Sequence, residues 1–329
     1  MSENLLSSLN ESQKVAAQHI DGPMLILAGA GSGKTKTITT RLAYLISIGI
    51  DPRSILTLTF TNKAATQMRE RAFSMLDPSM INTPPLLCTF HKFGLLFLKF
   101  HMSELDRKNN FIIIDTDDKK RIIKSLEKDI TTSLLVAEIS RYKNSLLTPN
   151  EAKKAAQLKL YQQIAEIYEK YEEYLEKNNL VDFDDLLLLP YRILSKNQKL
   201  AEDISQKYQY IMVDEYQDTN ELQYRLLRLL SSSHNNLCVV GDDDQSIYGW
   251  RGATIKNILN FSEHFENTNV VKLEENYRST DTILNHANQL IEHNRDRLGK
   301  KLIGTRQKGD SIRIYESQDE NEETRKIIE

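Results

Sequence analysis

Cysteine, tryptophan and long hydrophobic runs are scarce in this sequence, and each shortage excludes a class of protein. The 329 residues include only two cysteines, Cys88 and Cys238, and both lie within apolar segments. Two isolated cysteines provide neither a disulfide framework nor a closely spaced metal-binding pair, so we expect buried thiols in a reducing cytoplasm. No apolar run approaches a membrane-spanning length, and the polar N-terminus has no signal-peptide pattern. The composition therefore predicts a soluble cytoplasmic protein without a membrane partner.

An excess of positive charge is also lacking. Lys and Arg number 43 and Asp and Glu number 46, which gives a formal net charge of −3. Any contact with nucleic acid must then come from local placement of residues, because the chain has no overall basic field. Internal repeats and low-complexity linkers are not visible either. A chain of this length exceeds the usual single hydrophobic core, so we expect a multidomain α/β protein.

Short apolar segments alternate with amphipathic helical patterns, which predicts an α/β fold with a parallel sheet. The expected strands are residues 24–27, 55–60, 86–90, 210–214, 237–241 and 270–273. The pattern breaks after about His101 and resumes at Tyr210, so a mostly helical insertion splits the sheet domain. A long helix is expected at 151–177, with core packing favoured over a base-stacking stripe for its apolar and aromatic residues at three-four spacing, Tyr161, Ile164, Tyr168, Tyr171 and Leu175.

Acidic residues gather in the segment VDFDDLL. Asp182, Asp184 and Asp185 could suggest a metal or nuclease cluster, but no histidine or second acidic motif accompanies them. We therefore expect them to act in helix capping and turns.

The segment Gly241 to Ala253, GDDDQSIYGWRGA, places a side-chain amide five residues before the only tryptophan. Gln245 could sense a γ-phosphate or its attacking water, while Tyr248 and Trp250 offer rings on which a base could stack. The alternative is a polar turn in which Trp250 is a half-buried anchor and the three aspartates are solvated.

The segment AGAGSGKT, Ala28 to Thr35, follows an expected strand and opens an expected helix. In that context a glycine-rich loop wraps phosphates with its backbone N–H groups. Lys34 would bridge the β- and γ-phosphates, and the Thr35 hydroxyl would ligate Mg²⁺. Ala28 takes the first glycine position of the consensus, where a methyl group is compatible with a negative φ. The sequence therefore predicts a site for a nucleotide and Mg²⁺.

The segment VDEYQDTN, Val213 to Asn220, supplies an acidic pair at the end of another expected strand. Asp214 is assigned to Mg²⁺ and Glu215 to general base, because a phosphate loop needs a metal ligand and a group that activates water. A lone acidic pair at a helix start, favoured by the helix dipole, is the alternative.

Six motifs in order carry a family resemblance: AGAGSGKT, TFTNKAA, TFH, VDEYQDTN, GDDDQSIYGWRGA and LEENYRST. Together they resemble the superfamily 1 DNA helicases of the Rep/UvrD/PcrA family over nearly the whole chain. The sequences of the segments VDEYQDTN and VDFDDLLLLP look closest to those of Rep. The resemblance implies a RecA-like P-loop NTPase sheet with an inserted all-helical domain.

The resemblance also implies roles for particular residues. Catalysis would fall to Lys34, Asp214, Glu215, Gln245 and Arg278, with Thr35 and Asp214 on the metal. Nucleotide binding would involve Gln13, Ala28, Gly29, Ala30, Gly31, Ser32, Gly33, Lys34, Thr35, Lys36, Tyr277 and Arg278. Single-stranded DNA would meet Phe60, Thr61, Asn62, Lys63, His91, Tyr248, Trp250 and Arg251.

Several of these assignments have plain structural alternatives. Gln13, which would read adenine, could be a surface glutamine at a helix start. Asn62 could cap a helix, and His91 could be a capping or core histidine. Lys36 departs from the family, which usually has arginine there, and this puts bidentate or stacking contact to the nucleotide in doubt.

The implied organisation is a motor domain 1A at 1–104 and 186–275, a helical domain 1B at 105–185, and the start of a second motor domain 2A at 276–329. The expected activity is ATP-dependent unwinding of DNA with 3′ to 5′ movement on single strands, on a monomer or weak dimer that meets duplex junctions and replication or repair proteins. Since 2A is truncated in this reading, the 329 residues alone are expected to bind ATP weakly and not to unwind DNA.

Two other functions share these motifs. A subunit of a helicase–nuclease complex would carry a nuclease domain beyond the residues given. A nucleotide-controlled DNA-binding module would bind both ligands without productive turnover.

Overall fold

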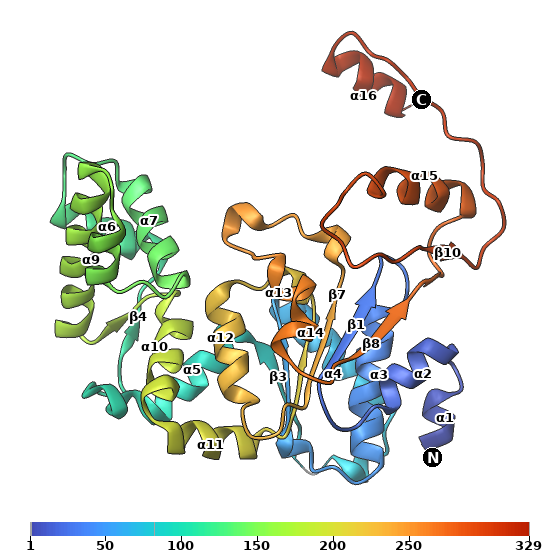
Figure 1. Cartoon of the computed structure of the whole chain (residues 1–329), viewed down its shortest axis with the longest axis horizontal. Coiled ribbons are helices and arrows are strands. Elements are labelled where there is room, and N and C mark those ends of the chain that lie inside the picture. The colour runs from blue at the N-terminus through green and yellow to red at the C-terminus, as the bar shows by residue number, and fades with distance from the viewer. Residues whose placement is uncertain (1, 82, 329) are drawn as a thin grey trace.

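Six parallel strands form the central sheet of the protein (Figure 1). The computed structural model describes residues 2–81 and 83–328. The sheet has the order β3-β2-β6-β7-β1-β8, and its strands are β1 (Met24–Ala28), β2 (Ile55–Thr59), β3 (Leu86–Thr89), β6 (Tyr210–Val213), β7 (Leu237–Gly241) and β8 (Asn269–Leu273). The register sets Leu58 beside Val213 and Leu27 beside Gly241. The structure confirms the predicted strands to within a residue at each end.

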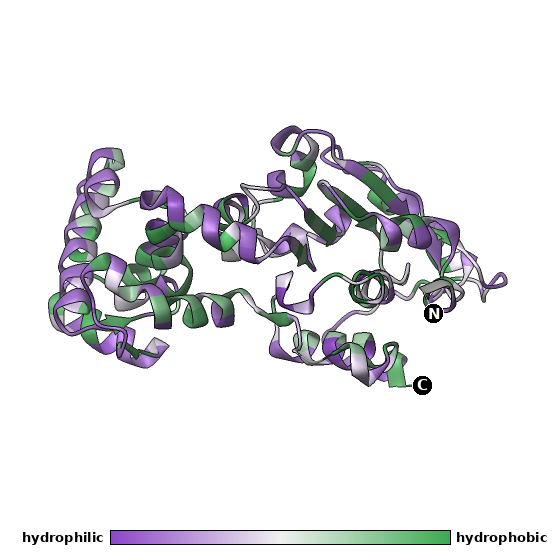
Figure 2. Ribbon diagram, turned by 90° about the horizontal axis from the view of Figure 1, so that it is seen from below, coloured by the Kyte–Doolittle hydropathy of each residue, from purple (hydrophilic) through white to green (hydrophobic). Residues whose placement is uncertain are grey.

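Both faces of the sheet are buried, because successive side chains of a strand point to opposite sides. In β1, Leu25 and Leu27 belong to one hydrophobic core, whereas Met24, Ile26 and Ala28 belong to another. The first core also holds side chains of α5 (Phe90–His101), α10 (Asp185–Lys196), α11 (Gln198–Lys207) and α12 (Glu221–Leu230), and the second holds side chains of α3 (Lys34–Ser47) and α4 (Asn62–Ser74). Figure 2 shows the central strands as largely hydrophobic. Because helices cover both faces of the sheet, the strands are unbroken apolar runs in the sequence.

The N-terminal helices lie on the β8 side of this sheet, whereas the C-terminal end of the chain extends away from it (Figure 1). The chain begins with α1 (Ser2–Leu6) and α2 (Glu11–Gln18). Between β7 and β8 it forms α13 (Lys256–Leu259) and α14 (Phe261–His264), and after β8 it continues through β9 (Glu275–Asn276), α15 (Asp281–Ile291), β10 (Ile303–Gly304) and α16 (Glu320–Ile328). β9 and β10 pair in parallel as a separate small ladder. Among the described residues, no helix combines the length and apolar character needed to span a membrane.

The predicted insertion is helical and has a core of its own. It consists of β4 (Ile112–Ile113), α6 (Thr116–Leu126), α7 (Thr132–Asn144), α8 (Pro149–Ala155), α9 (Lys159–Lys177) and β5 (Leu180–Val181), and its helices stand apart from the sheet (Figure 1). Tyr168 and Tyr171 are fully buried in this core together with Ile164 and Leu175. The prediction that this stripe packs in a core is confirmed.

The prediction of one long helix from residue 151 to 177 is wrong. The helix ends at Ala155, the backbone of Ala156 is extended with ψ 112°, and a new helix begins at Lys159. The break turns α8 so that Ala152 is buried in the same core as α9. A capping box between Thr148 and Glu151 starts α8. Tertiary packing has overridden a continuous helical pattern here.

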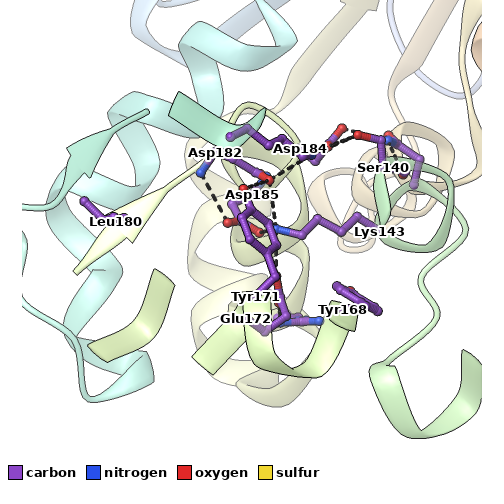
Figure 3. Close-up of polar contacts among 12 residues, drawn as sticks. Ser140, Lys143, Tyr168, Tyr171, Glu172, Leu180, Asp182, Asp184 and Asp185 are labelled. Carbon is purple, nitrogen blue, oxygen red and sulfur yellow. Dashed lines mark hydrogen bonds and ion pairs between the residues drawn. The ribbon is translucent and has the colours of Figure 1, made fainter. Parts of the chain in front are cut away.

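The capping role predicted for the acidic segment VDFDDLL is only part of what it does, because its carboxylates also pair with two buried lysines. Figure 3 shows one of them, Lys143, among these carboxylates. Lys119 Nζ lies 3.0 Å from Asp182 and 2.8 Å from Asp184. Lys143 Nζ lies 2.7 Å from Asp185 and 3.1 Å from Asp182. Two of the carboxylates also act as caps, since Asp182 accepts a hydrogen bond from the Asp185 N–H and Asp185 accepts one from the Asp182 N–H. The network ties α6 and α7 to the start of α10.

Candidate active site

A glycine-rich loop joins the end of β1 to the first turn of α3. Gly31 and Gly33 have φ values of 76° and 86°, in the left-handed region that favours glycine. A Cβ atom on Gly31 would lie 2.6 Å from the Cβ of Arg278, so side chains would also collide here. The Ser32 hydroxyl donates to the Gly29 carbonyl at 2.8 Å and closes the loop. The loop thus presents the N-terminus of α3, which favours an anion through its N–H groups and dipole.

A cavity of about 410 Å³ opens at this loop. Its volume is in the ordinary range for a small-molecule site. It is lined by Gly29, Ala30, Gly31, Gly33, Lys34, Thr35, Lys36, Arg71, Glu215, Gln245, Tyr277 and Arg278. Most residues predicted to bind nucleotide therefore share one cavity. Arg71, on α4, is a lining residue that the sequence analysis missed, because nothing in its segment distinguishes it from a surface arginine.

The acidic side of the cavity follows β6. Asp214 is buried, and its Oδ1 atom has no hydrogen-bond partner within the described part of the chain. Burial, and then the neighbouring Glu215 carboxylate, raise the pKa of Asp214 to about 7. A cation beside this oxygen would give it a partner and favour the charged form. The site therefore fits Mg²⁺ held by Asp214, with Thr35 on the cavity wall.

Glu215 faces the lysine of the loop. Its Oε2 atom lies 3.7 Å from the Nζ atom of Lys34 and accepts a hydrogen bond of 2.9 Å from Gln217 Nε2. Its backbone is left-handed with φ 53°, which is unusual outside glycine and sets the carboxylate at the turn after the strand. Gln217 was missed by the sequence analysis, although it lies in the same motif two residues further on. The structure brings the predicted base within reach of the predicted phosphate ligand.

Gln245 reaches the cavity from the loop after β7. Its amide donates to the carboxylate of Asp242, and the backbone N–H of Asp242 donates to Gln217 Oε1 at 2.9 Å. The three neighbouring aspartates are not solvated, so that alternative is wrong. Lys300 and Arg297 pair with them, and the Lys300 ammonium lies within 2.7 Å of an oxygen of each. The Lys300 ammonium thus occupies the space among these three carboxylates.

Residues after β8 complete the cavity. Asn276 Nδ2 donates to the Ala30 carbonyl at 2.5 Å, and its Oδ1 atom accepts from the N–H groups of Arg278 and Ser279. The Tyr277 N–H donates to the Gly31 carbonyl at 3.0 Å. These bonds hold Tyr277 and Arg278 against the glycine loop. Asn276 was missed by the sequence analysis, although it directly precedes the predicted pair.

Helix α2, near the N-terminus, supports the same glycine-rich loop. Gln13 is buried rather than on the surface, so that alternative is wrong. Its Nε2 atom donates to the Ser32 carbonyl at 2.9 Å, and its Oε1 atom accepts from the Asn10 N–H at 3.1 Å. The Lys36 ammonium donates to the Ser8 carbonyl. An adenine contact by Gln13 stays a prediction, and it requires one of these bonds to be exchanged.

The residues predicted to meet DNA follow β2, β3 and β7 at the same edge of the sheet as the glycine loop. Thr61 is the N-cap of α4, so the predicted alternative of an Asn62 cap is wrong. Asn62, Lys63 and His91 are exposed, and the half-buried Phe60 ring packs against Phe90 at 5.6 Å. Trp250 is 75% exposed and Tyr248 37%. The side chain of Arg251 lies outside the described residues.

Comparison with known families settles what kind of protein carries this arrangement. A model of the UvrD/REP helicase N-terminal domain matches residues 9–266. The chain belongs to the UvrD/REP helicase family. A model of the UvrD-like helicase C-terminal domain matches residues 271–329 of this UvrD/REP-family chain. Its parallel sheet, with the phosphate loop after β1, is therefore the RecA-like sheet of the family, as the sequence predicts.

Curated relatives resemble this UvrD/REP-family chain over almost all of its length. The ATP-dependent DNA helicase PcrA of Staphylococcus aureus (strain Mu50 / ATCC 700699) is 41% identical over 333 residues, which cover 98% of this chain and 45% of the relative. The protein of the same name from Staphylococcus epidermidis (strain ATCC 12228 / FDA PCI 1200) is 40% identical over 334 residues, with the same coverage. The chain thus spans slightly less than half the length of these relatives. The finer likeness to Rep stays a prediction.

The raised pKa of Asp214 predicts a dependence of stability on pH in EDTA. An acid whose pKa is higher in the folded state stabilises the fold below its unfolded pKa, and this contribution is lost as the pH rises through the folded pKa. The ordinary value is 3.8 and the folded value about 7. In Asp214→Asn the free energy of unfolding should match that of the wild type near pH 4 and exceed it increasingly up to about pH 7. Each pKa unit corresponds to about 1.4 kcal/mol, so the gap in the free energy of unfolding should reach on the order of 4 kcal/mol.

Urea unfolding followed by circular dichroism across this range measures the gap. Asp203→Asn, at an exposed carboxylate on α11, is the matched control and should give no trend. A constant difference between Asp214→Asn and the wild type would contradict the burial argument.

Proposed function

We propose that this chain is the motor portion of an ATP-dependent DNA helicase that hydrolyses Mg²⁺-ATP and moves along single-stranded DNA in the 3′ to 5′ direction. The observation that carries the proposal is the convergence of Lys34, Glu215, Gln245 and Arg278 on one cavity beside a glycine-rich phosphate loop. These residues come from widely separated parts of the sequence. Such a set provides what phosphoryl transfer requires, namely positioning and charge stabilisation.

Each residue has a role that its place in the cavity supports. Lys34 holds the β- and γ-phosphates, and Glu215, 3.7 Å away, orients a water and takes its proton. Gln245 senses the γ-phosphate or that water, and Arg278 stabilises charge on the transferred group. Thr35 and Asp214 would hold Mg²⁺, which would supply positive charge against the phosphates.

The base and sugar of the nucleotide would lie toward α2, the helix that carries Gln13. Tyr277 is 41% exposed at the cavity wall, so its ring is available to stack on adenine. Its hydroxyl contacts Asn10, the residue that caps the helix of Gln13. Gln13 therefore lies beside the place where an adenine edge would come.

The domain division also belongs to the proposal. Motor domain 1A takes residues 1–104 and 186–275, helical domain 1B takes 105–185, and 276–329 begin motor domain 2A. The separate hydrophobic core of the helical insertion supports 1B as a unit. ATP would lie between the two motor domains, and closure on it would move the DNA-binding surface. We place the protein in the cytoplasm as a monomer or weak dimer that works in replication or repair.

The nucleotide site is tested by two substitutions in the full-length protein. Lys34→Ala and Glu215→Gln should each abolish DNA-stimulated ATPase activity, with losses on the order of 100-fold or more, because each removes a group that acts in the transition state. Release of phosphate with and without single-stranded DNA is the measurement. Lys99→Ala and Glu263→Gln, at exposed positions, are matched controls and should keep wild-type turnover. Near wild-type turnover in Lys34→Ala or Glu215→Gln would refute the site assignment.

The DNA surface is tested at Trp250. Stacking of a base on an aromatic ring contributes about 1 to 3 kcal/mol, so Trp250→Ala should weaken binding of single-stranded DNA roughly 5- to 150-fold. Fluorescence anisotropy of a labelled oligonucleotide measures the change. Phe100→Ala removes another aromatic ring that is 75% exposed, near the C-terminal end of α5 and in a cavity with Leu86 at the start of β3, and it should leave affinity unchanged. Equal affinity for Trp250→Ala and the wild type would exclude Trp250 as a stacking platform.

The behaviour of the 329 residues alone is tested directly. With only the beginning of a second motor domain, the purified chain should bind a fluorescent ATP analogue weakly and should not separate a DNA duplex. Strand separation by this chain would contradict the proposed need for both motor domains.

A further inference from the structure

One buried lysine lies among three carboxylates next to the proposed sensor residue. The Nζ atom of Lys300 is 2.5 Å from Asp242 Oδ1, 2.7 Å from Asp243 Oδ1 and 2.6 Å from Asp244 Oδ2. The Lys300 side chain is only 2% exposed. Burial lowers the pKa of Lys300, but the three aspartates outweigh burial and raise it above its ordinary value. The Lys300 ammonium is therefore charged, and it is held in place against the loop that carries the three aspartates.

Arg297 forms a second contact to the same loop, but only at its outer end. Its Nε and Nη2 atoms donate to the two oxygens of Asp244 at 2.9 and 2.8 Å. The Leu298 N–H adds a bond of 2.6 Å to Asp243. Arg297 Nη2 also donates to the Lys300 carbonyl at 3.1 Å. Within the described residues the Arg297 side chain makes no hydrogen bond or ion pair with Asp242, so the two cations have different places beside the loop. Arg297 holds its outer end, and Lys300 reaches its inner end.

The inner aspartate connects Lys300 to Gln245. Asp242 Oδ1 pairs with the Lys300 ammonium and also accepts from the Asp244 N–H at 3.1 Å, while Oδ2 accepts the hydrogen bond from the Gln245 amide. A carboxylate held on one side by a fixed ammonium has little freedom to rotate. The orientation of the Gln245 amide thus depends on Lys300 through a single intervening group.

The same aspartate is connected to the proposed general base. Its backbone N–H donates to Gln217 Oε1 at 2.9 Å, and Gln217 Nε2 donates to Glu215 Oε2 at 2.9 Å. Asp242 therefore lies between the sensor and the base. Lys300 belongs to the region matched by the C-terminal family model, whereas the other members belong to the N-terminal one.

We propose that Lys300 is a positioning residue that orients Gln245 through Asp242 and so links the C-terminal region to the hydrolytic site. The role of Gln245 in ATP hydrolysis rests on the function proposed above, whereas its orientation by Lys300 does not. Lys300 does not line the nucleotide cavity and acts only through Asp242. Its loss should therefore change the rate of hydrolysis and leave nucleotide binding in place.

The test is Lys300→Met in the full-length protein, which removes the charge and keeps most of the stem. A misplaced catalytic group can reduce a rate about 100-fold, so the DNA-stimulated kcat should fall roughly 10- to 100-fold while the KM for ATP changes less than about threefold. Arg297→Gln is the matched control, because it loosens the outer end of the loop without removing a bond to Asp242, and its amide can still donate to the Lys300 carbonyl. It should keep kcat within about threefold. Equal losses in Lys300→Met and Arg297→Gln would overturn the proposal.

A double-substitution cycle separates positioning from loss of folding. If Lys300 acts through Gln245, Lys300→Met combined with Gln245→Ala should be no slower than Gln245→Ala alone, within about twofold. Independent, multiplicative losses would overturn the proposal. Should Lys300→Met fail to fold because three carboxylates lose their cation, the pair Lys300→Met with Asp243→Asn relieves that repulsion and leaves the Asp242 carboxylate in place. The same rate loss is expected from that pair.

A measurement independent of activity distinguishes failure of this proposal from failure of the proposed function. In protein labelled with ¹⁵N-glutamine, the side-chain amide signal of Gln245, identified by its loss in Gln245→Ala, should shift in Lys300→Met and stay unchanged in Arg297→Gln. An unmoved signal in Lys300→Met overturns the positioning role. A wild-type protein without DNA-stimulated ATPase activity would refute the proposed function, and the amide signal would still decide whether Lys300 orients Gln245.

Discussion

Parallel pairing of the six central strands is the constraint on which the rest of the structure depends. Every strand then ends at the same edge of the sheet, so the turns that follow β1, β6 and β7 lie next to one another. Lys34, Glu215 and Gln245 are brought to one cavity in this way, although more than two hundred positions separate the first from the last. The sheet can serve this purpose because both its faces are covered by helices, which leaves the strand ends as its accessible part.

Buried lysines surrounded by carboxylates join the parts of the chain that the sheet does not hold. Lys143 fixes the helical insertion to the start of α10, and Lys300 fixes the segment after α15 to the loop that carries Gln245. Taking such charges out of water is costly, and their pairing offsets that cost only when the geometry is good. Each cluster therefore specifies one arrangement of the elements it joins. The first is bonded through Asn144 to Asn220 at the end of the VDEYQDTN motif, whereas the second includes Asp242, which bonds to Gln245.

The glycine loop depends on partners from both ends of the chain. Gln13 bonds to the Ser32 carbonyl, and Asn276 bonds to the Ala30 carbonyl. The loop is thus held by side chains that precede and follow the sheet, and Tyr277 and Arg278 are placed by the same contacts. A shift of the C-terminal segment would therefore act on the phosphate site in two ways. It would move the partners of the glycine loop, and it would move Lys300 relative to Asp242. This arrangement suits the proposed coupling between hydrolysis and movement.

The sequence by itself determined the strands, the split of the sheet domain by helices and the main motifs, because unbroken apolar runs and a Gly-Lys-Thr turn depend on local pattern. Only the tertiary structure decided what depends on distant partners. The break between α8 and α9 has no local breaker and follows from packing of Ala152, and the burial of Gln13 follows from its contact with Ser32. The aspartates at 182–185 and 242–244 looked like turn residues, because the lysines that pair with them lie some 40 to 60 positions away. A carboxylate's role depends on the charge beside it, and proximity in a fold is set by tertiary packing rather than by sequence distance.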